Sequence, residues 1–404
     1  MLGDVLASGT LEIRTPRGRS QVITRSGSPR YSVTLKRPGM SIALMLYPSY
    51  YLPKYYVDGS LEIEGGDLRG LLTILMSGLG DNRHLSIVEA ARQRSQSLFD
   101  VLGRVGEIGR SRRDVQFHYD LSNDFFSGFL DSNMQYSCAY FDPWDTGLEA
   151  AQLRKMAHIA AKIDLKAGSR VLDIGCGWGG LAAFLARHHG VSVTGVTLSE
   201  RQAAYARERW SRHAVEFRLE DYRQHDGRYD RIVSIGMLEH VGRDRYDEYF
   251  RRIGELLKDD GLALVHTIGR RGPPMHINPW IRRHIFPGSY LPSLSQLAAA
   301  IERQGLWLLD CENLRLHYAR TLEHWWRRIE ARRSEIIATF GAPFYRAWEF
   351  YLTASELGFV YQGLTVYQLL VARSPTAAPI TRDFMWRAEA ELNRRIGSES
   401  TRAT

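Results

Sequence analysis

Val171-Leu-Asp-Ile-Gly-Cys-Gly-Trp-Gly-Gly180 is the stretch of sequence that decides the fold. Its first residues predict a short apolar strand, and an apolar helix is predicted directly after the glycines. Glycines in such a turn let the backbone bend tightly and approach a bound molecule closely. The dinucleotide fingerprint Gly-x-Gly-x-x-Gly also needs an acidic residue at the end of the next strand. Here an additional glycine, Gly179, precedes the last glycine of that spacing, and Thr197-Leu-Ser199 follows the next strand in place of an acid, which argues against NAD.

Helices and strands alternate on both sides of this turn. The hydrophobic periodicity predicts strands at 170–174, 191–196, 229–235 and 262–268, and helices at 181–189, 199–212 (N-capped by Ser199) and 246–257. Further along it predicts a strand at 307–311, helices within 320–340 and 344–357, and a last strand at 365–372. Such alternation is typical of a parallel sheet with helices on both faces. We therefore expect a Rossmann-like, doubly wound α/β domain over 111–396.

Residues 1–110 show a different pattern and are expected to form a smaller α+β domain. Alternating residues predict strands at 10–14 and 60–64, and 67–79 is predicted to be a short apolar helix capped by Asp67. Residues 1–113 contain 16 Lys and Arg against 10 Asp and Glu, so most of the excess positive charge lies here. A polar linker is expected at 103–113 and a disordered tail at 397–404.

The composition indicates a globular, basic protein. Of the 404 residues, 44% are hydrophobic and 24% are charged, and the net charge is +8 with a pI of about 9.4. This charge favours an anionic partner: a nucleic acid, an anionic lipid or an acidic small molecule. The longest apolar runs, 40–47 and 71–76, are far shorter than the about 20 residues of a membrane-spanning helix. The first residues lack a signal pattern and the three cysteines lack metal-ligand spacing, so we expect a cytoplasmic protein without a metal.

The glycine turn resembles the S-adenosylmethionine loop of class I methyltransferases. In that fold the loop meets the methionine end and the ribose of the cofactor, and the resemblance places the adenine at Asp221-Tyr222. The resemblance implies these cofactor-binding residues: Tyr136, Ser137, Asp173, Gly175, Gly177, Thr197, Leu198, Gln202, Asp221 and Tyr222.

Seven stretches of the chain, taken together, resemble the cyclopropane-fatty-acyl-phospholipid synthase family, which includes the mycolic acid cyclopropane synthases. They are Phe117–Phe126, Gln135–Phe141, Gly175–Gly180, Thr197–Gln202, Met237–Gly242, Leu264–Ile268 and Pro279–Pro287. They follow the family's order within residues 115–373. Residues 1–110 resemble only loosely the extra N-terminal domain of the longer bacterial members, for instance at Tyr56-Val-Asp-Gly59.

This resemblance implies an enzyme that transfers a methylene unit from S-adenosylmethionine to the cis double bond of an unsaturated phospholipid acyl chain. Methyl transfer leaves a carbocation, and loss of a proton from the new methyl group closes the ring. In the family the base is a bound bicarbonate, and the resemblance carries its ligands onto Cys138, Glu239, His266, the backbone of Ile268 and Tyr318. Aromatic faces stabilise a cation without reacting with it, and the candidates here are Tyr136, Tyr140, Trp178, Trp280, Phe286 and Tyr318.

Other functions stay open at the level of the sequence. A related lipid C-methyltransferase would give a methyl-branched or methylene product without ring closure. A non-catalytic lipid-binding module would retain only the fold, with His266 as an ordinary core histidine and Cys138 as a small packing residue. Nucleic-acid methylation is disfavoured because the chain has no Asn/Asp-Pro-Pro-Tyr motif of the DNA amino-methyltransferases.

The implied substrate lies in a bilayer, so we expect peripheral association with the inner face of the membrane. One candidate docking region is the basic N-terminal domain, which is also the candidate for homodimer formation. The other is 269–287, where Arg270, Arg271, Arg282 and Arg283 accompany Trp280, Ile285 and Phe286. The alternative for that segment is a lid whose apolar residues face the active site.

Overall fold

The structure, a computed structural model, describes residue 6, residues 8–79 and residues 122–402 of the chain. The predicted linker at 103–113 and residues 117–121 of the first family stretch lie outside the described residues. The chain divides into two compact units: 1–108, 276–287 and 322–364 form the first, and 109–275, 288–321 and 365–404 form the second. Among the described residues, none of the helices has both the length and the apolar character that a bilayer crossing requires.

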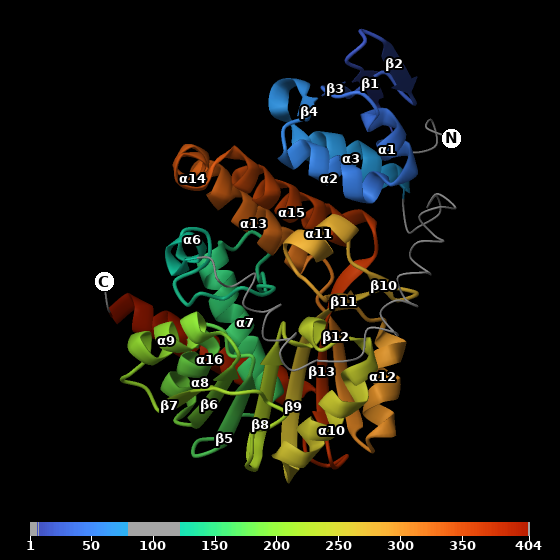
Figure 1. Ribbon diagram of the computed structural model, residues 1–404. Coiled ribbons are helices and arrows are strands. Elements are labelled where there is room, and N and C mark those ends of the chain that lie inside the picture. Colours follow the sequence, from blue (N-terminus) through green and yellow to red (C-terminus); the bar gives the residue numbers. More distant parts are fainter. Residues whose placement is uncertain (1–5, 7, 80–121, 403–404) are drawn as a thin grey trace. The chain divides into compact units, whose positions relative to one another are not determined.

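The second unit is built on a seven-stranded sheet (Figure 1). In spatial order its strands are β12 (Trp307–Asn313), β13 (Leu364–Ala372), β9 (Leu257–Arg270), β8 (Tyr229–Ile235), β5 (Arg170–Ile174), β6 (Ser192–Thr197) and β7 (Val215–Leu219). The strands from β9 to β7 run parallel, and β12 pairs antiparallel with β13. The predicted doubly wound α/β fold is confirmed. The patterns did not predict β7, an edge strand in which only Phe217 is buried.

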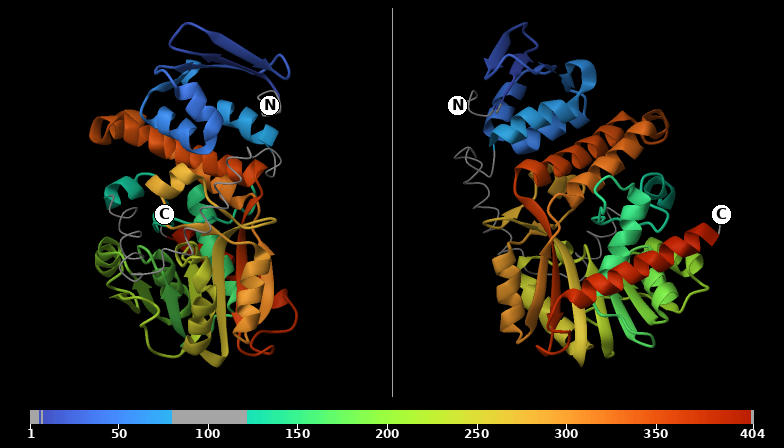
Figure 2. Two further views of the ribbon diagram at one scale, coloured as in Figure 1. Left: turned by 45° about the vertical axis from the view of Figure 1, so that its right-hand side comes forward. Right: turned by 180° about the vertical axis from the view of Figure 1, so that it is seen from behind.

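Successive residues of the central strands face opposite sides of the sheet and pack into two cores. Val171 belongs to the core formed with α7, α8 and α16, whereas Leu172 belongs to the core formed with α10 and α12. Figure 2 shows α16 lying across the sheet on the face opposite to α10. The helices of this unit are α6 (Asn123–Ser127), α7 (Leu148–Lys162), α8 (Gly180–His189), α9 (Glu200–Arg209), α10 (Tyr246–Leu256), α12 (Leu294–Arg303) and α16 (Asp383–Arg402). Helix α13 (His317–Ala331) begins in this unit.

The first unit has the α+β content that was predicted for residues 1–110. Its four-stranded sheet has the order β2 (Ser20–Thr24), β1 (Thr10–Arg14), β3 (Arg30–Leu35) and β4 (Leu61–Ile63). Asp67 caps the predicted helix, since its carboxylate accepts a hydrogen bond from the Gly70 N–H at 2.8 Å. The unit also contains later segments of the chain, so the N-terminal region is one part of a larger body. Its helices are α1 (Met40–Leu46), α2 (Pro48–Val57), α3 (Leu68–Leu79), α11 (Pro279–His284), α14 (Arg333–Phe340) and α15 (Ala342–Tyr361).

The C-terminal end differs from the disordered tail that was predicted from residue 397. Helix α16 continues to Arg402. Met385 and Leu392 of this helix are buried in the core beside α7 and α8, and they lie seven residues apart on one helical face. A helix anchored in this way extends past its last buried turn, and a polar composition alone does not reveal the anchor.

Candidate functional site

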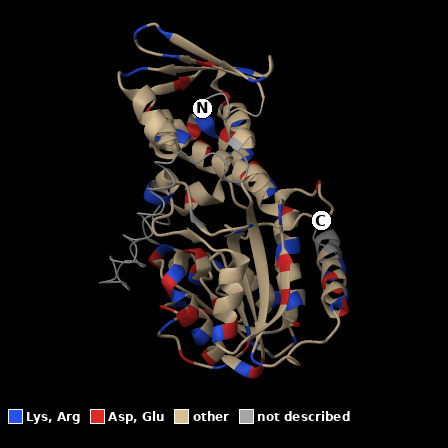
Figure 3. Ribbon diagram, turned by 90° about the vertical axis from the view of Figure 1, so that its right-hand side faces the viewer, with Lys and Arg blue, Asp and Glu red and all other residues tan. Residues whose placement is uncertain are grey.

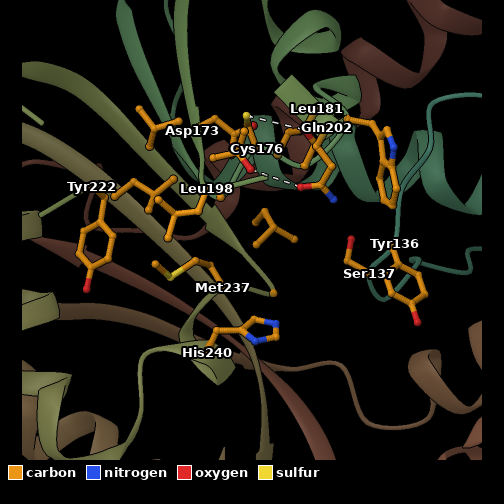
Figure 4. A pocket seen from close by; sticks show the side chains of 18 of the residues that line it. Tyr136, Ser137, Asp173, Cys176, Leu181, Leu198, Gln202, Tyr222, Met237 and His240 are labelled. Carbon is orange, nitrogen blue, oxygen red and sulfur yellow. Dashed lines mark hydrogen bonds between the residues drawn. The ribbon is translucent and has the colours of Figure 1, made fainter. Parts of the chain in front are cut away.

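A cavity opens in the second unit at the C-terminal ends of β5, β6 and β8, the edge at which parallel sheets bind ligands. Its empty volume is about 1160 Å³, part of which is open solvent. Figure 4 shows Leu198 and Tyr222 on one side of it and Tyr136 and Ser137 on the other. It is lined by all ten residues that were predicted to bind the cofactor: Tyr136, Ser137, Asp173, Gly175, Gly177, Thr197, Leu198, Gln202, Asp221 and Tyr222.

The turn after β5 has a backbone that favours glycine. Gly175, Gly177 and Gly179 have φ angles of 77°, 56° and 81°, in the left-handed region. A Cβ atom at Gly175 would also lie 2.9 Å from Cγ of Met237, so the loop after β8 packs directly on this turn. Helix α8 begins at Gly180, as the sequence predicts. The glycine pattern therefore shapes the floor of the cavity.

The side chain of Gln202 is oriented by the loop that precedes α9. The Ser199 hydroxyl accepts from the Gln202 N–H at 3.3 Å, which confirms Ser199 as the N-cap. The Thr197 hydroxyl donates to Oε1 of Gln202 at 3.3 Å and itself accepts from the Ser199 N–H at 3.2 Å. Because Oε1 is already bonded, the Gln202 amide nitrogen is the donor left for a ligand in the cavity.

Asp221 and Tyr222, predicted to meet the adenine, follow β7 and form the far wall of the cavity. Arg223 holds the Asp221 carboxylate through two hydrogen bonds, Nε to Oδ1 at 2.9 Å and Nη2 to Oδ2 at 2.6 Å. Burial opposes ionisation of Asp221, but the hydrogen bonds from Arg223 outweigh it and lower the pKa. The Tyr222 ring is buried edge-on against Tyr249, with centroids 5.6 Å apart. The carboxylate is thus charged, fixed in place and able to accept further hydrogen bonds.

A buried lysine below the cavity is a residue that the sequence analysis missed. Lys155 of α7 has no exposed surface, and its Nζ donates to Oε1 of Gln135 and to Oγ of Ser137, the latter at 3.0 Å. Burial lowers the pKa of Lys155 to about 8 and raises the pKa of the neighbouring Asp173 to about 7. Oδ2 of Asp173 is buried without a hydrogen-bond partner in the described part of the chain. Lys155 therefore fixes two side chains of the cavity wall.

Glu239 and Ile268, two of the predicted bicarbonate ligands, are in direct contact. The Ile268 N–H donates to Oε1 of Glu239 at 2.6 Å, which joins the loop after β8 to β9. Oε2 of Glu239 is buried and has no partner among the described residues. Burial raises the pKa of Glu239 to about 7. The next residue, His240, lines the cavity, and burial lowers its pKa to about 4.

The remaining predicted ligands come from three other segments, and none of them lines the cofactor cavity. His266 is buried on β9, with Nδ1 3.2 Å from the amide nitrogen of Gln368. Cys138 is buried directly after Ser137, and burial raises the pKa of its thiol. The Ala139 N–H donates to the Thr321 hydroxyl at 3.0 Å, so the segment after Cys138 is attached to α13, the helix that carries the buried Tyr318. No hydrogen bond joins Cys138 or His266 to Glu239 in the described chain.

Of the seven side chains of 269–287 that were proposed for docking, Arg271 and Arg283 are exposed, Arg282 and Phe286 are partly exposed, and three are buried. Arg270 in the second unit is 3% exposed, and Trp280 and Ile285 in the first unit are 4% and 6% exposed. The backbone of Arg270 belongs to the end of β9, and the Trp280 ring packs edge-on against Phe350, with centroids 5.6 Å apart. Burial removes these three side chains from the docking set that was expected, whereas docking through the other four stays a prediction. The sequence shows their amphipathic composition but not which side chains the fold buries.

Comparison with known proteins gives several relatives along most of the chain. The family model described as mycolic acid cyclopropane synthetase matches residues 107–369. The cyclopropane-fatty-acyl-phospholipid synthase of Escherichia coli (strain K12) is 37% identical over 353 residues, 87% of this chain and 90% of its own. A probable fatty acid methyltransferase of Pseudomonas putida is 34% identical, over 89% of this chain and 92% of its own. A tuberculostearic acid methyltransferase of Mycobacterium tuberculosis is 39% identical, over 65% of this chain and 66% of its own.

The solved structures that are similar to this chain include cyclopropane synthases as well. A cyclopropane synthase from Mycobacterium tuberculosis is 35% identical with a TM-score of 0.62, over 65% of this chain and 98% of its own. A mycolic acid cyclopropane synthase complexed with SAH and CTAB is 35% identical with a TM-score of 0.61, over 64% of this chain and 97% of its own. The mycolic acid enzymes thus match about two thirds of this chain, whereas the Escherichia coli enzyme matches most of it.

Proposed function

The chain belongs to the mycolic acid cyclopropane synthetase family, and from this membership we propose that it is a cyclopropane-fatty-acyl-phospholipid synthase. It would transfer a methylene unit from S-adenosylmethionine to the cis double bond of an unsaturated phospholipid acyl chain. A phospholipid substrate is favoured because the relative named for phospholipids matches the chain over nearly its full length, including the N-terminal region. The family model described as mycolic acid cyclopropane synthetase begins only at residue 107.

The observation that carries this proposal is the buried, half-partnered carboxyl of Glu239 beside the cofactor cavity. In the proposed reaction the carbon–sulfur bond of the sulfonium breaks, a carbon–carbon bond forms to the alkene, and the new methyl group loses a proton as the ring closes. Such a site needs a base next to the methyl donor and must exclude water, which would capture the cation. Glu239 stands between Met237 and His240, both of which line the cavity, so it is adjacent to where the methyl donor would bind.

The chemistry of the five predicted ligands suits a bound bicarbonate, which would supply the base. Oε2 of Glu239 is buried without a partner within the described chain, and the buried His266 makes its contact with Gln368 through Nδ1. Glu239 with a pKa of about 7 is able to carry the proton that compensates a nearby anion. The Ile268 N–H is bonded to Glu239, so the backbone group that would face a ligand is its carbonyl oxygen, which also accepts from the Thr267 hydroxyl at 3.2 Å. Cys138 and Tyr318 complete the proposed ligand set.

A second product is supported by the relatives themselves. Two of them are named as methyltransferases, and their identity to this chain is similar to that of the cyclopropane synthase. The alternative function is therefore methyl transfer to the same double bond without ring closure. The two functions share the methyl donor and the lipid and differ only in the fate of the cation.

Lipid analysis of a bacterial host that expresses the chain tests the proposal. We expect phospholipid acyl chains that gain one CH₂ unit, with ring protons in the NMR spectrum of the purified lipid. A host that expresses Glu239→Gln is the control. A methyl-branched or methylene product without a ring would establish the alternative, and unchanged lipids with bound S-adenosylmethionine would contradict both.

The surface of the first unit supports docking to a membrane through its N-terminal part. Ile42, Met45 and Leu46 of α1 are 59%, 59% and 53% exposed, and their spacing of three and one residues places them on one helical face. Exposed apolar residues at such spacing suit the interface of a bilayer. Around the β1–β2 hairpin, the exposed Arg17, Arg19 and Arg25 have no acidic partner in the described chain. Figure 3 shows basic positions along these strands.

A further inference from the structure

A chain of buried polar side chains runs from His266 on β9 through Gln368 on β13 to Lys162 on α7. The Nδ1 atom of His266 lies 3.2 Å from Nε2 of Gln368, and Oε1 of Gln368 lies 2.7 Å from Nζ of Lys162. Lys162 also donates to Oε2 of Glu312. His266, Gln368 and Lys162 are 2%, 0% and 2% exposed, so water does not satisfy these groups. The three residues come from β9, β13 and α7 of the second unit.

The ammonium group of Lys162 determines which way the Gln368 amide points. A lysine ammonium has three donors and no acceptor, so the atom that faces it must be the amide oxygen. The amide nitrogen then faces His266, and this nitrogen only donates. Nδ1 of His266 must therefore be the acceptor, without a proton. In a neutral imidazole the proton is then on Nε2, the ring nitrogen that does not face Gln368.

We propose that Lys162 is a positioning residue that, through Gln368, holds His266 as the neutral tautomer with its proton on Nε2. The inference rests on the proposed function in one respect: the Nε2–H of His266 would face the proposed bicarbonate site beside Glu239. There it would act as a donor to a bound anion. A protonated imidazole would instead point an Nδ1–H at an amide N–H, which is repulsive. His266 thus contributes a hydrogen bond without changing the charge of the site.

The groups around His266 support a neutral imidazole. Burial lowers the pKa of His266 well below its usual value, and the nearby cations Lys155, Lys162 and His158 lower it further. The group that raises the pKa of His266 is Glu312, which lies between Lys162 and His158. Glu312 therefore holds the Lys162 ammonium in place while its own charge is shared between two cations.

The charge on Lys162 is maintained by the outer part of the same chain. Nε2 of His158 lies 2.7 Å from Glu312, and Nδ1 of His158 lies 2.9 Å from Glu389 of α16. With a carboxylate at each ring nitrogen, His158 donates at both. Two cations and two carboxylates then alternate, which counteracts the lowering of the Lys162 pKa by burial. The arrangement is built to keep Lys162 charged, and only a charged Lys162 fixes the orientation of the amide.

The tautomer is measurable in the full-length protein without substrate. We expect long-range ¹H–¹⁵N NMR correlations of ¹⁵N-histidine-labelled protein to show His266, assigned by its loss in His266→Gln, with Nε2 protonated and Nδ1 bare. In Gln368→Glu the carboxylate accepts only, so Nδ1 of His266 should become protonated. Lys162→Met should give a mixture of tautomers. Ser355→Ala on α15, which takes no part in this chain of bonds, is the control and should leave His266 unchanged.

Turnover provides the second readout. Gln368→Glu should lower kcat about 10- to 100-fold, the cost typical of removing the group that orients a functional histidine. The KM for S-adenosylmethionine should change less than about twofold, because Gln368 does not line the cofactor cavity. A wild-type His266 with its proton on Nδ1 would overturn the inference. Failure of the proposed function would appear in the lipid product instead and would leave the tautomer as found.

Discussion

The Ile268 N–H donates to Oε1 of Glu239 at 2.6 Å, while Oε2 of the same carboxyl is buried without a partner in the described chain. One oxygen is thus used by the fold, and the other remains for a ligand. Because the two oxygens have separate roles, Glu239 is the residue on which the chemistry is best tested. A substitution that keeps the shape of the side chain also keeps the hydrogen bond from the Ile268 N–H.

Glu239→Gln should lower turnover by about 100-fold or more, the scale of a lost group in proton transfer. The amide retains an oxygen that accepts from Ile268 but lacks the titratable proton. The affinity for S-adenosylmethionine, measured by calorimetry, should stay nearly unchanged, since Glu239 does not line the cofactor cavity. Loss of cofactor binding would identify Glu239 as a cofactor ligand and contradict its assigned role.

The same variant should change how stability depends on pH. Burial raises the pKa of Glu239 from 4.5 to about 7, so the folded state holds this proton more tightly than the unfolded state. The contribution of the group is therefore fully present below pH 4.5 and is lost as pH rises through 7. Each unit of pKa difference corresponds to about 1.4 kcal/mol. Between pH 4.5 and pH 8 the free energy of unfolding of Glu239→Gln should therefore rise by roughly 3 kcal/mol relative to that of the wild type.

Urea unfolding at pH 4.5, 6 and 8 measures this difference. The comparison is made without added bicarbonate, because a ligand that binds the folded state would alter the linkage. A constant difference between the two proteins across this range would show that Glu239 does not titrate with a raised pKa.

Lys155→Met should weaken S-adenosylmethionine binding about tenfold. The ammonium of Lys155 holds Gln135 and Ser137 at the cavity wall, and a thioether of similar length removes both hydrogen bonds but fills the space. Gln135 and Ser137 would be left without a buried partner, which costs on the order of 1–3 kcal/mol. Calorimetric titration with the cofactor checks the affinity. Ser355→Ala on α15, away from the cavity lining, is the control and should bind normally; unaltered binding by Lys155→Met would contradict the role assigned to it.

The sequence predicted the catalytic fold and the family because both are encoded in local patterns. The apolar strand and glycine turn from Val171 to Gly180 form as expected, and all ten cofactor residues meet at one cavity because they follow neighbouring parallel strands. Lys155 and Gln368 escaped notice because one lies in a helix with several other polar residues and the other in a mostly apolar strand. Such residues look solvent-facing until the packing partners are known. The joining of 322–364 to the N-terminal region depends on long-range packing, which local periodicity does not contain.

Membrane docking is predicted to depend on α1. Replacing Ile42, Met45 and Leu46 together with serine removes the exposed apolar stripe, and sedimentation with anionic vesicles should fall at least tenfold, since each apolar side chain contributes on the order of 1–2 kcal/mol at an interface. Replacing Arg17, Arg19 and Arg25 with glutamine should weaken binding to anionic but not to neutral vesicles, and added salt should have the same effect. The matched control replaces Ile380 and Trp386 of the second unit, which are 85% and 62% exposed, with serine and should bind like the wild type. If the control loses as much binding as the α1 variant, vesicle association reflects general surface hydrophobicity and α1 is not the docking element.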